Sequence, residues 1–263
     1  MTPEAIEEAV SILERTRLDG GAIEALPEHC RPHDEAEAYA IQAALGARLS
    51  QAGLGPVVGH KVGCTNPKMQ AYIGIPNPAS GSIHQRMVKN LRGEFRHDTF
   101  VRPGVECEIA VRLATALPPS RAPYTRASVA EAVDSVMASF EIVDDRYKDF
   151  RSIGTPTLIA DDFFDAGCVL GAPVVNWRSL DLAALKGTIT INGKEASAGV
   201  SHMVMGHPFE SLAWLANDLA RRGRGLQAGT FVLTGSIAEV IWVKPGDVAV
   251  GAIEQLGSVT ARF

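Results

Sequence analysis

The chain has 263 residues, of which 46% are hydrophobic, enough to bury a sizeable core in one large domain or in two closely packed ones. Its formal net charge of -5 leaves no excess of basic residues of the kind that binds a phosphate backbone, so the sequence argues against nucleic acid as a partner. We therefore expect the partner to be a small molecule.

The N-terminal stretch MTPEAIEEAVSILERTR has neither the basic region nor the apolar region of a secretory signal, and no later run is long enough to cross a bilayer. We therefore expect no membrane partner and a cytoplasmic location. The four cysteines are far apart and form no C-x-x-C pair, which predicts neither a zinc site nor a disulfide framework. They are Cys30, Cys64, Cys107 and Cys168.

Two helices are predicted near the N-terminus. Thr2 as the N-cap and Pro3 at the first helical position begin the first helix, and apolar residues then recur at helical spacing. Asp34 and Glu37 form a capping box that begins the second. The segment 19–34 between them is rich in Gly, Pro and His, which is typical of a long surface connection and can form a lid.

After the second helix, short apolar runs broken by Gly and Pro predict strands. These runs are 56–63, 104–114, 166–175, 187–193, 229–235, 240–253 and 257–263. Two further helices are predicted among them. One begins near Ser128, which pairs with Glu131 as a capping box, and continues through Phe140. The other begins at Pro208 and ends before Gly223.

Helices at the start and strands in the remainder predict an α+β fold with a largely β core. The motif KPGD, Lys244 to Asp247, predicts a type II turn between two strands. A doubly wound nucleotide-binding fold is disfavoured because no G-x-G-x-x-G follows a strand and begins a helix. We expect residues 1–55 to form a helical segment packed on the core, and residues 56–263 to form the main domain, as one structural unit.

The segment GVECEIAVRLA places two carboxylates in an otherwise apolar strand. Because side chains alternate between the faces of a strand, Glu106 and Glu108 share one face, about 7 Å apart. Like charges at that separation cost free energy unless water, a cation or protonation relieves them. One interpretation is a solvated strand face on which Arg112 or a cross-strand lysine supplies the relief.

A third acid, Glu141, lies at the start of another apolar run, directly after the helix predicted from Ser128. A helix between two short strands returns the chain beside the first strand, which would bring Glu141 near the pair. Three carboxylates without a thiolate or an imidazole form a hard oxygen site, suited to Mg²⁺ or Mn²⁺ rather than zinc. The alternative for Glu141 is an ion pair with Arg146 at the end of the strand.

Several segments together resemble the fumarylacetoacetate hydrolase superfamily, in its 2-keto-4-pentenoate hydratase and oxalocrotonate decarboxylase branch. They are GHKVGCTNPKMQAYIGI, VECEIAV, FEIVDDRY, VLGAPV, GHPFESLAWLANDLARRG and VLTGS, and the E-x-E with its later Glu is the most specific element. The resemblance implies a β-rich mixed sandwich or roll surrounded by helices. It also implies one divalent ion held by Glu106, Glu108 and Glu141, and small 2-oxo or 2-hydroxydienoic acids as substrates.

Lys61 lies between Gly59 and Gly63, whose missing side chains would let a ligand approach the strand closely. The resemblance places Lys61 where the family has an active-site lysine, and a bound cation nearby would favour its general acid or base role. The alternative is an exposed strand lysine. Thr234, in LTGS, corresponds to a segment that lines the substrate pocket, so its hydroxyl is a candidate ligand-binding group; the alternative is an ordinary turn.

Two segments depart from the family pattern. Where the hydratases carry an acid, PNPASGSI has Ala79, and where small hydroxyl residues are expected, ADDFFDAG has Phe164 and Asp165. Asp161, Asp162 or Asp165 could substitute for the missing acid, and Asp165 is a candidate substrate-binding residue. Each of the three is explained equally well as a loop cap or a solvated charge.

We expect a divalent-metal-dependent lyase that hydrates 2-keto-4-pentenoate-type substrates in aromatic catabolism, with Lys61 moving protons. The alternatives are decarboxylation of a 2-oxo acid, C–C hydrolysis of an acylpyruvate and, in a different class, a non-catalytic partner subunit. Related hydrolases and decarboxylases carry a His/Glu dyad on a lid; His29 and His33 are candidates for it, although surface-loop histidines are the favoured interpretation. The resemblance also implies a homo-oligomer that can associate with a related pathway enzyme.

Overall fold

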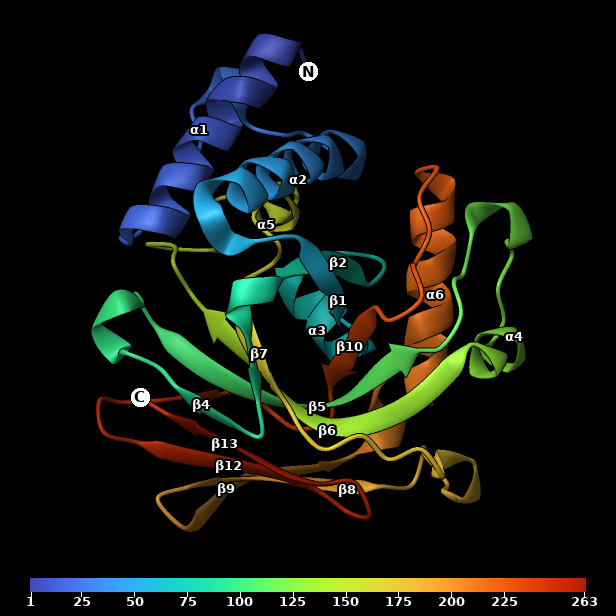
Figure 1. Cartoon of the computed structure of the whole chain (residues 1–263). Coiled ribbons are helices and arrows are strands. Elements are labelled where there is room, and N and C mark those ends of the chain that lie inside the picture. The colour runs from blue at the N-terminus through green and yellow to red at the C-terminus, as the bar shows by residue number, and fades with distance from the viewer.

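The structure is a computed structural model that describes residues 1–263 (Figure 1). None of its helices combines the length and the apolar character that a bilayer crossing requires. The α-helices are α1 (Pro3–Asp19), α2 (Glu35–Leu49), α3 (Pro67–Ile73), α4 (Arg126–Glu131), α5 (Thr155–Ala160) and α6 (Pro208–Arg221).

Thirteen strands join into one mixed sheet in the order β2-β1-β10-β5-β6-β7-β3-β4-β13-β12-β8-β9, with β11 paired to β5. N-terminal helices followed by a strand-rich body confirm the α+β prediction. The strands are β1 (Val57–Gly63), β2 (Ala79–His84), β3 (Val88–Asn90), β4 (Arg92–Glu94), β5 (Pro103–Leu113), β6 (Val133–Asp144), β7 (Asp165–Leu170), β8 (Lys186–Ile191), β9 (Lys194–Val200), β10 (Phe231–Ser236), β11 (Ile241–Trp242), β12 (Val248–Ile253) and β13 (Gly257–Arg262).

The sheet curls so that β12, β13 and β8 form a second layer beneath β5 and β6 (Figure 1). The largest core cluster fills the space between the layers and extends to α6. On β5 this cluster takes every second residue: Val105, Cys107, Ile109, Val111 and Leu113. The opposite face of β5 and β6 is directed toward the side of the molecule where α1, α2 and α5 lie (Figure 1).

The two N-terminal helices begin where their caps predict. Thr2 Oγ1 accepts a hydrogen bond from the Ala5 N–H, and Asp34 Oδ1 accepts one from the Glu37 N–H. Helix α1 packs on α2, and α2 packs on α5, around a second core cluster. The connection 19–34 contributes buried residues to this cluster, so it is packed against the helices rather than free. They are Ile23, Leu26 and Cys30.

The helix predicted from Ser128 through Phe140 is wrong. Helix α4 is capped by Thr125 and ends at Glu131, and the chain from Val133 onward is strand β6. The apolar positions Val136 and Phe140 satisfy helical spacing and strand alternation equally. Both faces of β6 are buried, so it has no solvated face; Ser135, Ser139 and Glu141 alternate on one side, but they lie in the interior.

The other elements follow the predictions more closely. Each predicted apolar run contains a strand, and α6 begins at Pro208. Gly246 has φ of 85° in the KPGD turn, as a type II turn requires at that position. All four cysteines are free and buried in the structure. The elements that the sequence did not predict are β2, β3, β4, β6, β9, α3 and α5.

Candidate metal centre

Three glutamates meet on the inner face of β5 and β6. Glu106 and Glu108 share a face of β5, as alternation predicts, and Glu141 of β6 is the direct antiparallel partner of Glu106. One carboxylate oxygen from each lies within 4.8 Å of the others. Glu108 and Glu141 are buried, and Glu106 is half-buried. We call Glu106, Glu108 and Glu141 the glutamate triad.

Burial and mutual repulsion oppose ionisation of the glutamate triad. Burial, together with the charges of Glu141 and Glu106, raises the pKa of Glu108 well above its usual value. Burial also raises the pKa of Glu141 to about 7, although Lys61 acts in the opposite direction. Charge of this kind, on oxygen donors alone, is what a hard divalent cation relieves.

The hydrogen-bond partners of the glutamate triad leave oxygen atoms available. Glu108 Oε2 accepts a hydrogen bond of 2.7 Å from the Gly235 N–H. Glu141 Oε1 is buried and accepts no directed hydrogen bond, although Lys61 Nζ lies 3.1 Å away. A buried carboxylate oxygen without a donor is unusual in proteins, so the triad fits a bound cation.

Lys61 lies beside the triad, with a side chain that is 3% exposed. Its ammonium donates a hydrogen bond of 2.5 Å to the carbonyl oxygen of Phe163. Burial alone would lower the pKa of Lys61, but the carboxylates of Glu141, Asp165 and Glu106 outweigh burial and raise it. Lys61 is therefore an ammonium at neutral pH in this structure, and it is a buried strand lysine rather than an exposed one.

A cavity of about 440 Å³ opens onto Lys61 and Glu106. The aromatic rings in its wall come from separate segments of the chain: Tyr72, Phe150, Phe163, Phe164 and Trp242. A largely apolar cavity with a few convergent charged groups is typical of a small-molecule site. The glutamate triad therefore lies at the wall of a space that can hold a small acid.

The two glycines that flank Lys61 have different surroundings. Gly63 lines the cavity, and a Cβ atom there would lie 3.3 Å from the Phe163 ring and 3.7 Å from Lys61 Nζ. A Cβ atom at Gly59 would lie 2.3 Å from the Phe231 ring, so the space beside Gly59 is filled by a core side chain. The prediction that both glycines admit a ligand is therefore wrong for Gly59.

The structure does not bring Thr234 or Asp165 to the cavity. Thr234 is fully buried, and its hydroxyl donates a hydrogen bond of 2.8 Å to the Ile109 carbonyl, so it is not free for a ligand. Asp165 is also fully buried and faces Arg17 and Arg146. Neither side chain lines the cavity in this structure, so their role as substrate-binding residues stays a prediction. Ser236, two residues after Thr234, does line the cavity, as do the hydroxyl residues Thr65 and Tyr72.

The remaining candidates also lie outside the cavity. Asp161 and Asp162 are fully buried among arginines, and Ala79 is buried opposite Gly63 in the pair of β1 and β2. None of these side chains supplies an acid to the cavity wall. The lid candidates His29 and His33 are exposed, which agrees with surface-loop histidines. His29 lies 2.9 Å from Glu8, and His33 lies 3.2 Å from Glu37.

Sequence reasoning missed four charged residues that line the cavity: Arg102, Asp145, Arg151 and Glu239. Arg102 lies 3.4 Å from Asp145 and stacks on Trp242, and burial raises the pKa of Asp145. Arg151 lies over the rings of Tyr72 and Phe150. The charge-rich run DDRYKDFR at the end of the strand of Glu141 could have indicated Asp145 and Arg151, whereas Arg102 and Glu239 lie in other segments.

Residues 68–263 match the family model described as fumarylacetoacetate (FAA) hydrolase, C-terminal. A 4-oxalocrotonate decarboxylase from Pseudomonas putida is 33% identical over 228 residues, which cover 87% of this chain and 85% of that protein. A 2-keto-4-pentenoate hydratase from Paraburkholderia phymatum is 34% identical over 265 residues, with 98% and 97% covered.

Among solved structures, 4-oxalocrotonate decarboxylase from Pseudomonas putida G7, complexed with magnesium and adipate, matches with a TM-score of 0.92 and 29% identity. The match covers 100% of this chain and 98% of that one. A fumarylpyruvate hydrolase from Pseudomonas aeruginosa, in complex with Mn²⁺ and pyruvate, matches with a TM-score of 0.64 and 16% identity, over 79% and 89% of the two chains, and shows the shared fold.

Proposed function

The chain belongs to the fumarylacetoacetate hydrolase family, and from this premise we propose that it is a divalent-metal-dependent lyase that hydrates 2-keto-4-pentenoate-type substrates. The observation that carries the proposal is the glutamate triad, whose charge the buried Lys61 relieves only in part, at the wall of a cavity. The hydratase relatives support this reaction, and we place it in the breakdown of aromatic compounds.

We propose that Glu106, Glu108 and Glu141 hold Mg²⁺ or Mn²⁺. The donor set is oxygen only, as these hard cations prefer, and the related decarboxylase structure contains magnesium. When bound, a divalent cation stabilises the negative charge that develops on the oxygens of a 2-oxo acid. Glu106 is the triad member that lines the cavity, so a cation held by the triad would be reached from the cavity on the Glu106 side.

Lys61 is proposed to hold and move a proton at Nζ. Its ammonium lies in the cavity wall, where it is fixed by the Phe163 carbonyl and by Glu141. Gly63 leaves open the space next to the ammonium, so a substrate carbon can approach it. An ammonium held in this way can donate a proton during enol–keto interconversion and take it back afterward.

Decarboxylation of a 2-oxo diacid is the second candidate, because two guanidinium groups line the cavity. Arg102 shares its charge with Asp145, whereas Arg151 contacts the Tyr72 hydroxyl and two rings and forms no ion pair. An unpaired guanidinium in a cavity is suited to a distal carboxylate. The related decarboxylase structure contains adipate, a diacid. Acylpyruvate hydrolysis and a non-catalytic role have no comparable support.

A spectroscopic screen tests this proposal. Freshly generated 2-hydroxypenta-2,4-dienoate, a 2-oxo diacid and an acylpyruvate are each mixed with the protein and Mg²⁺, with E106Q as the inactive control. We expect the dienoate absorbance to be lost with the wild-type protein and to be kept with E106Q. Turnover of the diacid alone would replace hydration by decarboxylation, and turnover of the acylpyruvate alone would overturn the lyase assignment. Absence of metal binding by calorimetry would support the non-catalytic role.

We propose that residues 1–55 and 56–263 form a single structural unit, with 56–263 as the catalytic domain. The second core cluster supports this, because it contains residues of α1 and α2 together with residues of α5. A homo-oligomer, association with a related pathway enzyme and a cytoplasmic location remain predictions. Light scattering of the pure protein, alone and mixed with a pathway decarboxylase, tests the first two.

A further inference from the structure

The segment 161–165, which we call the aspartate turn, has an unusual backbone. Three consecutive residues that are not glycine, Asp162, Phe163 and Phe164, have φ of 55°, 53° and 69°. Residues with a Cβ atom rarely adopt this left-handed region, and a run of three is unfavourable unless the surroundings impose it. The aspartate turn must therefore be held by contacts outside itself.

The position of Lys61 depends on the aspartate turn. The Lys61 ammonium donates to the Phe163 carbonyl, which is the middle of the three left-handed residues. A Cβ atom at Gly81 would lie 2.8 Å from the Asp162 carbonyl oxygen and 3.0 Å from Lys61 Cε, so the turn and the lysine pack tightly on β2. Movement of the turn would therefore move the ammonium.

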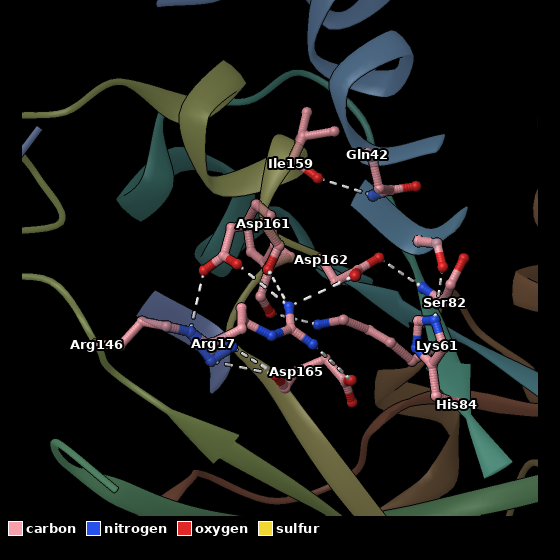
Figure 2. A network of polar contacts seen from close by, with 12 residues as sticks. Arg17, Gln42, Lys61, Ser82, His84, Arg146, Ile159, Asp161, Asp162 and Asp165 are labelled. Atoms are coloured by element: carbon pink, nitrogen blue, oxygen red, sulfur yellow. Dashed lines mark hydrogen bonds and ion pairs between the residues drawn. The ribbon is translucent and has the colours of Figure 1, made fainter. Parts of the chain in front are cut away.

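Arg17, in the last turn of α1, is the link between the N-terminal helices and the aspartate turn (Figure 2). Its Nη1 donates hydrogen bonds of 3.2 Å to the carbonyl oxygen and to Oδ1 of Asp161, and lies 3.5 Å from Asp162 Oδ2. Its Nη2 lies 3.8 Å from Asp165 Oδ2. The guanidinium thus reaches both ends of the turn.

The other contacts of the turn come from different elements. Asp162 Oδ1 accepts a hydrogen bond of 2.8 Å from the Ser82 N–H, and Arg146 Nε donates one of 3.0 Å to Asp161 Oδ2. Three aspartates face the two guanidinium groups of Arg17 and Arg146, and all of these side chains are buried. Without Arg17, a single guanidinium would face three buried carboxylates.

We propose that Arg17 is a positioning residue for the reaction at Lys61. It lies outside the substrate cavity, and it fixes the aspartate turn so that the Phe163 carbonyl holds the Lys61 ammonium at the glutamate triad. The proposal rests on the proposed function, in which Lys61 moves the proton. It also makes residues 1–55 part of the catalytic apparatus, although none of them lines the cavity.

Chemical rescue of R17A tests the proposal. A separate cavity of about 180 Å³ is lined by Arg17, Arg146 and Asp165, so removal of the Arg17 side chain opens a space that guanidinium ion can enter. We expect kcat to fall about 100-fold, as for a small misplacement of a catalytic group, with KM and metal affinity nearly unchanged. Millimolar guanidinium should restore at least a tenth of the lost activity. A purely structural role predicts no restoration and would overturn the proposal.

The matched control is R48M. Arg48 also joins α1 and α2, through Glu14 and Glu7, but it does not reach the aspartate turn. R48M should lose stability and keep its kcat. If kcat falls no further in R17A than in R48M, relative to wild type, the proposal is wrong. Should R17A fail to fold, D162N replaces it, since it keeps the side-chain volume and removes the charge opposite Arg17.

A second readout does not depend on turnover. Reductive methylation followed by mass spectrometry measures how exposed the Lys61 amine is, with the 85% exposed side chain of Lys68 as an internal reference. We expect Lys61 to be methylated several-fold faster in R17A than in wild type, and unchanged in R48M. Equal rates in R17A and wild type would overturn the proposal. If wild type turns over no substrate, the proposed function fails, and methylation still decides whether Arg17 positions Lys61.

Discussion

Two clusters of three carboxylates lie near Lys61, and they differ in how their charge is balanced. In the glutamate triad, three carboxylates and the Lys61 ammonium leave two negative charges when all are ionised. In the aspartate turn, three carboxylates and the two guanidinium groups of Arg17 and Arg146 leave one negative charge. The triad therefore lacks the charge of one divalent cation, whereas the turn is nearly neutralised by the chain itself.

This difference in charge balance favours a structural role for the aspartate turn and a metal-binding role for the glutamate triad. Carboxylates that serve a structural role are given permanent partners by the protein, because an unpaired buried charge is costly. The carboxylates of the glutamate triad, for which we propose a metal, are left under-compensated. In keeping with this, Glu141 Oε1 has no hydrogen-bond donor at the triad, while Asp161 accepts from Arg17, Arg146 and Tyr147.

The largest effect is expected at the centre of the triad. E108Q should weaken Mg²⁺ binding by more than about 100-fold in calorimetry and abolish turnover, since even an outer-shell partner of a metal costs 10–100-fold. E239Q, at the cavity mouth, is the matched control and should bind metal normally. Metal binding to E108Q with wild-type affinity would contradict the assignment of the triad.

The same variant gives a pH test. The pKa of Glu108 is raised in the folded state, so its ionisation opposes folding once the pH exceeds the usual glutamate pKa of about 4.3. Without metal, the free energy of unfolding of wild type should fall as pH rises from acid to neutral. E108Q should show a smaller fall, and urea denaturation at several pH values measures it. An equal fall in both proteins would contradict the charge comparison.

K61M should reduce kcat by about 10²–10⁴-fold, the usual contribution of a general acid or base. Metal affinity should be kept or increased, because the substitution removes a positive charge 3.1 Å from Glu141. Steady-state kinetics and calorimetry measure the two effects. K68M, an exposed lysine beside the cavity, should behave as wild type. Full activity in K61M would exclude Lys61 as the proton carrier.

G81A should lower kcat about tenfold, and stability by about 1–3 kcal/mol, because the new Cβ atom has to displace the Asp162 carbonyl. Kinetics and thermal unfolding test this. The control is G46A in α2, where a Cβ atom meets nothing within 4 Å and should add about 0.5–1 kcal/mol to stability. If G81A loses stability without losing kcat, the aspartate turn does not position Lys61.

T234V should have the smallest effect. It removes the hydrogen bond to the Ile109 carbonyl, which costs about 1 kcal/mol, and leaves kcat and KM unchanged because Thr234 does not reach the cavity. S236A changes a hydroxyl residue that lines the cavity and serves as the comparison. A rise in KM for T234V, with S236A unaffected, would restore Thr234 as a ligand-binding residue.

Most of the glutamate triad can be predicted from the sequence. Alternation along one strand requires Glu106 and Glu108 to share a face, which is a local property of the chain. The approach of Glu141 was also expected, but through a helix, whereas β6 runs antiparallel to β5 and places Glu141 opposite Glu106. The spacing of Val136 and Phe140 does not distinguish these two routes.

The contacts and the backbone conformation of the aspartate turn cannot be predicted from the local sequence. Arg17 meets Asp161 across 144 residues, and no spacing rule connects them. The left-handed residues Asp162, Phe163 and Phe164 are not glycines, so residue type gives no indication of their conformation. The surroundings of Thr234 are likewise non-local, since the partner of its hydroxyl, Ile109, is 125 residues away.

Trp242 gives the cavity an optical signal. Its ring stacks on the Arg102 guanidinium, 4.2 Å from the ring centroid, in the cavity wall. The other two tryptophans, Trp177 and Trp214, belong to the largest core cluster or pack against it. A molecule that enters the cavity and engages Arg102 will change the surroundings of one indole of three. Intrinsic fluorescence can therefore report occupancy directly, including for compounds that the protein binds without converting them.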